Sequence, residues 1–283
     1  MKFAKMQGTG NDYIYVNCFE ETVFDPPAAA KFLSDRHFGV GSDGLVLIEP
    51  SDRADFKMDI YNSDGSRARM CGNAARCVAK YVCDNGLTDK SLISLETPGG
   101  IKYIDIYKEN GKVVSARVNM GAPILKSRDI PALFDSDTVI DLPLKVGAKS
   151  YRITCLSMGN PHCVIFSNDA DSVNIQKTGP EFENHPAFPD RINTEFVQPL
   201  SGSRIKMRVW ERGAGETLSC GTGACAAAAA CILNGYCKRD TDITVTLRGG
   251  ELLINWSADG AVYLTGPAAT VFTGEIACCG GAR

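Results

Sequence analysis

The sequence predicts an α+β protein of two homologous, pseudo-symmetric halves, each a curled, mostly antiparallel sheet around a central helix. The segment Cys71-Gly72-Asn73-Ala74-Ala75 returns 149 positions later as Cys220-Gly221-Thr222-Gly223-Ala224. Both copies continue into a helix-like stretch that ends at an Asn-Gly pair, again 149 positions apart. Helix-like and alternating segments are mixed without a regular strand–helix–strand order, which is typical of the α+β class.

Further landmarks extend the duplication along the chain. At the same offset or one residue from it, matching pairs are Gly10-Asn11 with Gly159-Asn160, Ile60-Tyr61-Asn62 with Val209-Trp210-Glu211, and Gly99-Gly100 with Gly249-Gly250. Such a series in one order is hard to obtain by chance. We therefore expect one half to comprise residues 1–118 plus 268–283 and the other residues 119–267, with a less regular joining segment near 118–150.

The individual elements follow from local patterns. A first helix is expected over Pro27–His37, opened by proline and stopped near Gly39. Alternating apolar residues predict strands at Ile93–Leu95, Lys102–Ile106 and Ile243–Val245, and the Gly-Gly pairs suit tight hairpins between strands.

The two helices that follow the Cys-Gly pairs differ in polarity. The helix over Thr222–Leu233 is almost entirely Ala and Cys, and a helix that is apolar all round is buried. Its counterpart carries Arg76 and Lys80, so we expect it to be less completely enclosed.

Composition excludes several classes of function. The chain has 283 residues and a net charge of −3, and no basic block marks a nucleic-acid binder. The longest apolar run, residues 224–233, is too short for the roughly 20 residues that span a bilayer. The N-terminus has no apolar core of the kind found in a signal peptide. These features predict a cytoplasmic protein with neither a nucleic-acid nor a membrane partner.

Cysteine is unusually frequent, with 12 residues. No pair has the C-x-x-C spacing, and His37, His162 and His185 stand far apart, so we expect no metal site. Most of these thiols are expected to be reduced and buried.

Cys71 and Cys220 are the exceptions, because each precedes a helix. A helix N-terminus offers unpaired N–H groups and positive potential, which favour a thiolate and bind a substrate carboxylate. If both helix N-termini converge on one cleft, one thiolate removes a proton from a stereocentre and the opposite thiol returns one to the other face. This arrangement predicts racemisation or epimerisation without a cofactor.

Several segments together resemble the diaminopimelate epimerase family over residues 3 to about 276. They are Gly8-Thr9-Gly10-Asn11-Asp12, Met70-Cys71-Gly72-Asn73-Ala74-Ala75-Arg76-Cys77, Gly159-Asn160-Pro161-His162, Glu211-Arg212-Gly213-Ala214-Gly215-Glu216-Thr217 and Ser219-Cys220-Gly221-Thr222-Gly223-Ala224. The resemblance implies interconversion of LL- and meso-2,6-diaminoheptanedioate in lysine and peptidoglycan precursor biosynthesis, by a homodimer.

The resemblance also implies the site. Cys71 and Cys220 would be the opposed acid and base, and His162 and Glu211 would tune the thiol pKa values. Arg212 suits the distal carboxylate, because a guanidinium fork binds it bidentately. The expected substrate contacts are Asn11, Asn62, Gly72, Asn73, Asn160, Asn193, Glu211, Arg212, Gly221 and Thr222. One departure is Gly44, where many family members carry Gln.

Other interpretations remain open at this point. Asn beside Gly is usually a turn residue, and Asn62 fits a turn as well as a site. A proline or hydroxyproline racemase would share the paired thiols, a related isomerase branch replaces them with other acids, and the cysteine count alone would suit a redox or metal-storage protein. Gly39–Gly44 resembles a phosphate loop only loosely. Cys278 and Cys279 lie in a Gly-rich tail that is expected to fray and has no assigned function.

Overall fold

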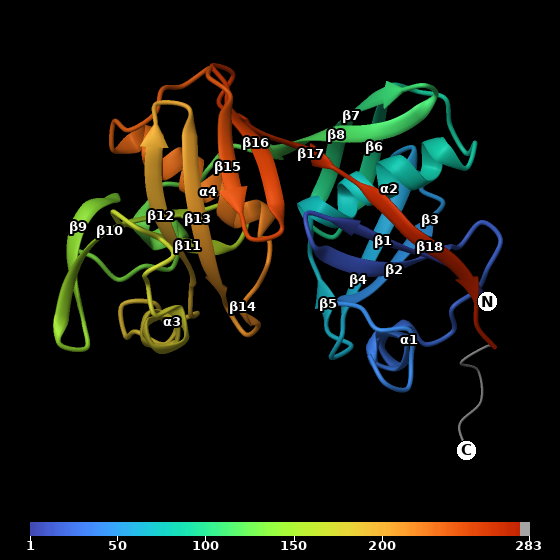
Figure 1. The fold of residues 1–283 in the computed structure, drawn as a ribbon, viewed down its shortest axis with the longest axis horizontal. Coiled ribbons are helices and arrows are strands. Elements are labelled where there is room, and N and C mark those ends of the chain that lie inside the picture. Colours follow the sequence, from blue (N-terminus) through green and yellow to red (C-terminus); the bar gives the residue numbers. More distant parts are fainter. Residues whose placement is uncertain (278–283) are drawn as a thin grey trace. The chain divides into compact units, whose positions relative to one another are not determined.

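The computed structural model describes residues 1–277, which form two compact units (Figure 1). The first unit contains Met1–Val118 together with the chain from Thr265 onward, and the second contains Asn119–Leu264. The boundaries fall within two strands, β8 and β17. The predicted division into two catalytic halves, one with Cys71 and one with Cys220, stays a prediction. Cys278 and Cys279 lie outside the described residues.

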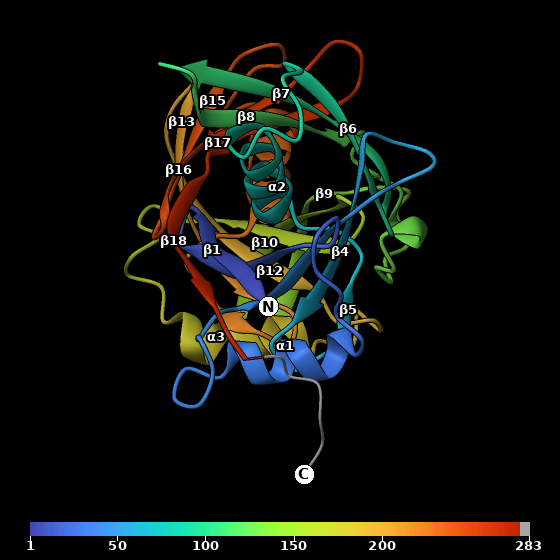
Figure 2. The same cartoon turned by 90° about the vertical axis from the view of Figure 1, so that its right-hand side faces the viewer.

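The first unit is a curled sheet with one helix inside it. Its elements are β1 (Lys2–Gly8), β2 (Asn11–Asn17), α1 (Pro26–Ser34), β3 (Gly44–Glu49), β4 (Phe56–Asn62), β5 (Arg67–Ala68), α2 (Gly72–Asp84), β6 (Leu92–Thr97), β7 (Gly100–Glu109), β8 (Lys112–Gly121) and, from the end of the chain, β18 (Ala269–Glu275). Neighbouring strands run β18-β1-β2-β3-β4-β6-β7-β8, antiparallel except for β2–β3 and β4–β6. Strands surround α2 in Figure 2, and α2 contacts β1, β2, β7 and β18.

The second unit repeats this plan. Its elements are η1 (Ser127–Asp129), β9 (Val139–Val146), β10 (Lys149–Ser157), β11 (Pro161–Phe166), α3 (Ile175–Glu183), β12 (Asn193–Ser201), β13 (Arg204–Glu211), β14 (Gly215–Glu216), α4 (Gly221–Leu233), β15 (Ile243–Leu247), β16 (Gly250–Trp256) and β17 (Val262–Pro267). Strands β9-β10-β11-β12-β13-β15-β16 are neighbours, antiparallel except for β11–β12 and β13–β15.

The duplication is visible in the helix bounds. Helices α3 and α4 begin and end 149 positions after α1 and α2. Strand β10, the counterpart of β1, pairs with β9, whereas β1 pairs with β18. The edge strand therefore occupies the same place in both sheets, although β9 precedes its partner in the chain and β18 comes from the end of the chain. The predicted α+β class, with a curled sheet around a central helix in each half, is confirmed.

Packing explains why each central helix is enclosed. Helix α4 contacts six strands, β10, β11, β12, β13, β15 and β16, through its small side chains, most of which are completely buried. The outer helices cover the opposite face of each sheet. Ala30 and Leu33 of α1 join one apolar core with Ile14 and Leu45, and Ile175 and Phe182 of α3 join another. Burial of such side chains contributes about 25 cal/mol for each Å² removed from water.

Three sequence expectations need correction. Helix α1 ends at Ser34, short of His37, because Asp35 adopts an extended conformation and its carboxylate accepts the N–H groups of His37 and Phe38. The joining segment contains a regular strand, β9, paired with β10. Of the two charged residues expected to leave α2 less enclosed, Arg76 is 0% exposed and donates to the carbonyl oxygens of Gly72 and Pro267, whereas Lys80 is partly exposed as expected.

Candidate active site

Cys71 and Cys220 occupy equivalent positions as the N-cap residues of α2 and α4. Both have extended backbone conformations, as N-cap residues commonly do. The Cys71 sulfur accepts the N–H of Ala74 at 3.5 Å, and the Cys220 sulfur accepts that of Gly223 at 3.4 Å. The predicted placement of each thiol at a helix N-terminus is therefore observed, whereas their catalytic role stays a prediction.

Around Cys71, three polar side chains converge from β2, α2 and the loop before β3. Asn11 Oδ1 lies 3.4 Å from Cys71 Sγ and 3.3 Å from Asn73 Nδ2. Asn11 Nδ2 donates to Asp43 Oδ2 at 2.8 Å, and the same oxygen accepts the N–H of Asp12. Because Asp43 binds the NH₂ group of Asn11, the amide carbonyl is directed to the thiol.

Around Cys220, a hydrogen-bonded chain leads from the sulfur into the sheet. Cys220 Sγ lies 3.5 Å from Thr222 Oγ1, which accepts from Asn160 Nδ2 at 3.3 Å. Asn160 Oδ1 lies 3.0 Å from His162 Nε2, and His162 Nδ1 lies 2.6 Å from Glu195 Oε1. The first unit brings Asn11 and Asn73 to Cys71, and the second brings Thr222, Asn160 and His162 to Cys220.

The pKa of Cys220 is raised well above its ordinary value. Burial is the main cause, and the negative charges of Glu211 and Glu195 act in the same direction, while hydrogen bonds from Thr222 and Gly223 oppose them. The helix N–H of Gly223 lowers the pKa of Cys220 as expected, but the net shift is upward, so the expectation of a net lowered pKa is wrong for Cys220. Desolvation outweighs two hydrogen bonds because it disfavours the charged form directly.

Asn193 and Arg212 are joined by the backbone. The Asn193 side chain, 4% exposed, donates to the carbonyl oxygen of Pro161 at 2.8 Å and accepts the N–H of Arg212 at 2.9 Å. The Arg212 side chain is exposed, and its Nη1 donates to the carbonyl oxygen of Asp190. Asn193 thus fixes the backbone from which Arg212 extends, and a guanidinium largely in water remains available for an anion.

The remaining predicted residues fall at strand ends and helix starts. Asn62 closes a turn through Ser66, as a turn residue would. Glu211, at the end of β13, accepts the Thr217 hydroxyl, and Gly72 and Gly221 are the buried first residues of α2 and α4. Their roles in substrate binding stay predictions.

A Cβ at Gly44 would lie 2.1 Å from the carbonyl oxygen of Tyr61, so any side chain at this position requires the backbone to shift.

Asp43 and Glu195 are not among the residues predicted from the sequence. Asp43 stands in a Gly-rich loop, where a carboxylate is ordinary. Glu195 directly precedes the apolar pair Phe196-Val197 in a segment that forms a buried strand, and an isolated charge in such a strand needs a partner, so the sequence offered only this weak signal.

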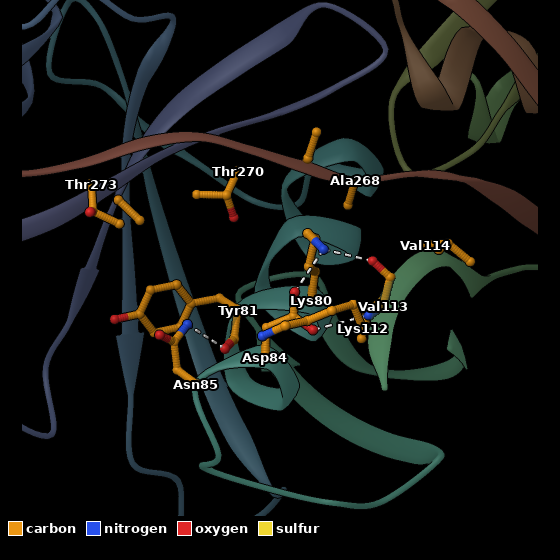
Figure 3. A pocket seen from close by; sticks show the side chains of 12 residues that line it. Lys80, Tyr81, Asp84, Asn85, Lys112, Val113, Val114, Ala268, Thr270 and Thr273 are labelled. Atoms are coloured by element: carbon orange, nitrogen blue, oxygen red, sulfur yellow. Dashed lines mark hydrogen bonds and ion pairs between the residues drawn. The ribbon is translucent and has the colours of Figure 1, made fainter. Parts of the chain in front are cut away.

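A pocket of about 600 Å³ lies at the other end of α2, away from Cys71 (Figure 3). Its charged residues include Lys80, whose Nζ donates to Asp84 Oδ2 and to the carbonyl oxygen of Val113. None of the predicted site residues lines this pocket, so it is separate from the thiol networks. Within residues 1–277, no three His, Cys, Asp or Glu side chains gather as a metal site would, and no helix is long and apolar enough to cross a membrane.

The chain is similar to known proteins over almost its whole length. Residues 3–126 and 154–271 match the family model described as diaminopimelate epimerase. A diaminopimelate epimerase of Acetivibrio thermocellus is 55% identical over 277 residues, covering 98% of this chain and 98% of the relative. One of Methanococcus maripaludis is also 55% identical, covering 98% and 99%.

Solved structures show the same fold at low identity. A probable proline racemase from Agrobacterium radiobacter aligns with a TM-score of 0.72 and 15% identity, covering 98% of this chain and 92% of that one. A phenazine biosynthesis protein of the PhzF family from Bacillus anthracis aligns with a TM-score of 0.71 and 16% identity, covering 98% and 99%. These likenesses establish the architecture, whereas the sequence matches are specific. On the family model and the full-length relatives, the chain belongs to the diaminopimelate epimerase family.

Proposed function

We propose that the chain interconverts LL- and meso-2,6-diaminoheptanedioate by a two-thiol mechanism that needs no cofactor. Membership of the family makes it an isomerase of lysine biosynthesis that acts on diaminopimelate. Cys71 and Cys220 act as the acid and base on opposite faces of one α-carbon. The observation that carries this mechanism is the repetition of a thiol N-cap at equivalent points of both units, each sulfur accepting a helix N–H.

The proton balance of the reaction is simple. One thiolate takes the α-proton and becomes a thiol, and the C–H electron pair passes into the α-carboxylate. That pair then forms the new C–H bond with a proton from the other thiol on the opposite face, and this second sulfur is left as a thiolate. The developing negative charge needs oriented donors, and the helix N-termini behind Cys71 and Cys220 can supply them. The raised pKa of Cys220 supports its serving as the proton-donating thiol when Cys71 is the base.

The substrate is recognised by side chains whose charge and hydrogen-bonding groups are complementary to its carboxylates and ammonium groups. The exposed Arg212 guanidinium suits the distal carboxylate, and Glu211 and the Asn side chains offer acceptors to the ammonium groups. Asn11, Asn62, Gly72, Asn73, Asn160, Asn193, Gly221 and Thr222 complete the proposed contacts. A homodimer and independence from pyridoxal phosphate belong to the same proposal.

The reaction can be tested with each diaminopimelate stereoisomer in D₂O, followed by NMR at the α-carbon. We expect uptake of one deuteron with inversion from the LL and meso isomers, in the presence of a chelator and a thiol reductant, and none at proline. Absence of exchange from every isomer would overturn the proposal. Turnover of proline would point to the racemase alternative, and loss of activity in chelator would indicate a metal. Sedimentation velocity measures the oligomeric state.

A further inference from the structure

Glu195 and His162 form a completely buried pair in the second unit, where β11 and β12 run side by side (Figure 1). Both side chains are 0% exposed, and His162 Nδ1 lies 2.6 Å from Glu195 Oε1. Glu195 Oε2 has no hydrogen-bond partner among residues 1–277. A buried carboxylate is costly unless it is paired, and here only one of its two oxygens has a partner.

Gly223 places this pair close to the reactive sulfur. A Cβ at Gly223 would lie 2.8 Å from Glu195 Oε1 and 3.3 Å from Cys220 Sγ. Because glycine has no side chain, the carboxylate and the sulfur can both lie close to this position. A free carboxylate there would work against a thiolate, as the raised pKa of Cys220 shows. Glu195 and His162 share one proton between them, and this keeps the net charge of the pair close to zero.

The chain of hydrogen bonds has a direction that can be derived link by link. Asn160 donates its NH₂ group to Thr222 Oγ1, so its carbonyl Oδ1 faces His162 and can only accept. His162 must therefore carry a proton on Nε2. Thr222 already accepts one hydrogen bond, and its own O–H is available to donate to Cys220 Sγ at 3.5 Å.

His162 meets this requirement in either of two protonation states. An imidazolium donates from Nδ1 to the Glu195 carboxylate, and a neutral imidazole accepts at Nδ1 from a protonated Glu195. In both states Nε2 keeps its proton and the chain ends with a hydroxyl donor at the sulfur. A neutral imidazole protonated only on Nδ1 would break the chain at Asn160.

We propose that Glu195 is a positioning residue of this epimerase, which holds His162 in the Nε2–H form and thereby directs the Thr222 hydroxyl at Cys220. The inference rests on the proposed function of Cys220. Glu195 touches no reacting atom; it acts through His162, Asn160 and Thr222. Its contribution appears when Cys220 has given up its proton, because a donated O–H then stabilises the sulfur anion.

Two substitutions separate tautomer control from simple charge. In Glu195→Gln the amide can donate to Nδ1 and keep the Nε2–H form, so we expect kcat to fall less than about threefold. In Glu195→Leu nothing pairs with Nδ1, and we expect kcat to fall about 10- to 100-fold, the range typical for losing a group that orients a functional imidazole. In serine proteases the corresponding amide is harmful, because there Nε2 must accept a proton. The opposite outcome is expected here.

Thr194→Val is the matched control. Thr194 is the neighbour of Glu195 on β12, is also 0% exposed, and points to the other face of the strand. Its substitution disturbs the same strand without touching the chain of hydrogen bonds, so both kcat and the His162 spectrum should stay as in the wild type.

The state of His162 can be read directly, since the chain has only three histidines. In ¹⁵N-histidine spectra, assigned with His162→Gln, we expect a protonated Nε2 in the wild type and in Glu195→Gln, and loss of that fixed form in Glu195→Leu. A Gln variant as slow as the Leu variant, or a Leu variant that retains the Nε2–H signal and full kcat, would overturn the proposal.

The two proposals fail in different ways. If the wild-type protein does not exchange the α-proton of diaminopimelate, the proposed function fails whatever His162 does. If exchange is normal and the spectra of the three Glu195 forms are alike, only the positioning role fails. Circular dichroism and thermal melting of each variant show whether a loss of rate reflects unfolding.

Discussion

The two thiols sit in networks of opposite polarity, although their backbones are near copies. Asn11 and Asn160 are equivalent residues, yet Asn11 turns its carbonyl toward Cys71 whereas Asn160 turns its NH₂ group toward Thr222 and Cys220. The first network presents an amide carbonyl, which accepts, to Cys71, and the second presents a hydroxyl that can donate to Cys220.

The residues behind each asparagine account for the difference. In the first unit the carboxylate of Asp43 binds the amide NH₂ group, whereas in the second the His162–Glu195 pair faces the amide carbonyl. At the offset of 149, Tyr13 and Val46 stand where the second unit has His162 and Glu195. Duplication thus preserved the scaffold that caps each helix with a thiol, and substitutions behind the scaffold made the two thiols unequal.

Removal of one sulfur is expected to have the largest effect. Cys71→Ala and Cys220→Ala should each reduce epimerisation by at least about 10³-fold, because a positioned acid or base contributes about 10²- to 10⁴-fold and no second group replaces it. Deuterium exchange from each stereoisomer separates the two roles, since each variant should lose the proton abstraction that its own thiolate performs.

Cys237→Ala is a suitable control for the loss of a thiol, because Cys237 lies beyond the C-terminal end of α4, far along the helix from Cys220. It should epimerise normally. Wild-type turnover by either of the first two variants would remove that cysteine from the mechanism.

A second difference between the units is the charge at the ends of β4 and β13. Asn62 and Ser63 in the first unit correspond to Glu211 and Arg212 in the second. Arg212→Lys should raise KM by about 10- to 100-fold, equivalent to about 1–3 kcal/mol, because Lys cannot bind a carboxylate bidentately.

Arg152→Lys changes another exposed arginine, which is paired with Asp141, and should leave KM as it is. Initial rates over a range of diaminopimelate concentrations decide the matter, and an unaltered KM for Arg212→Lys would exclude Arg212 from the substrate site.

The polarity of the first network can be changed through Asp43. Asp43→Leu releases the amide of Asn11, so its carbonyl no longer faces Cys71 in one orientation, and we expect kcat to fall about 10-fold. Asp43→Asn retains an oxygen that can accept from Asn11 Nδ2 and should restore most of the rate. If both variants lose activity equally, the charge of Asp43, not the orientation of Asn11, is what the site requires.

Duplication made much of this fold and site predictable. The duplication was enough to locate the start of both central helices and the two asparagines, because these features recur at one spacing. Residues that differ between the two halves cannot be found by comparing the halves. Val46 and Glu195 share no chemistry, so comparison of the halves could not reveal the pair with His162.

The direction in which the pKa of Cys220 shifts could not be predicted from the sequence. It depends on burial and on two carboxylates brought near by folding, and these outweigh the helix terminus that the pattern showed. The end of α1 was misplaced because the carboxylate of Asp35 captures backbone N–H groups that a longer helix would have used internally.

The smallest expected effect concerns a buried thiol on α2. Cys77 stands where α4 has Ala226, and burial raises its pKa to about 11. A thiol held neutral in the folded state stabilises the protein below its unfolded pKa, and that stability is lost as the pH rises toward 11, because the unfolded chain then ionises more readily. Relative to Cys77→Ala, the wild type should lose about 1 kcal/mol of unfolding free energy between pH 8 and pH 10. Urea unfolding of both proteins at the two pH values measures this difference, in which other alkaline titrations cancel. If the difference in unfolding free energy between the wild type and Cys77→Ala is the same at both pH values, the folded state accommodates the Cys77 thiolate. Replacing Ala by Cys at this position of the helix would then have no pH-dependent effect on stability.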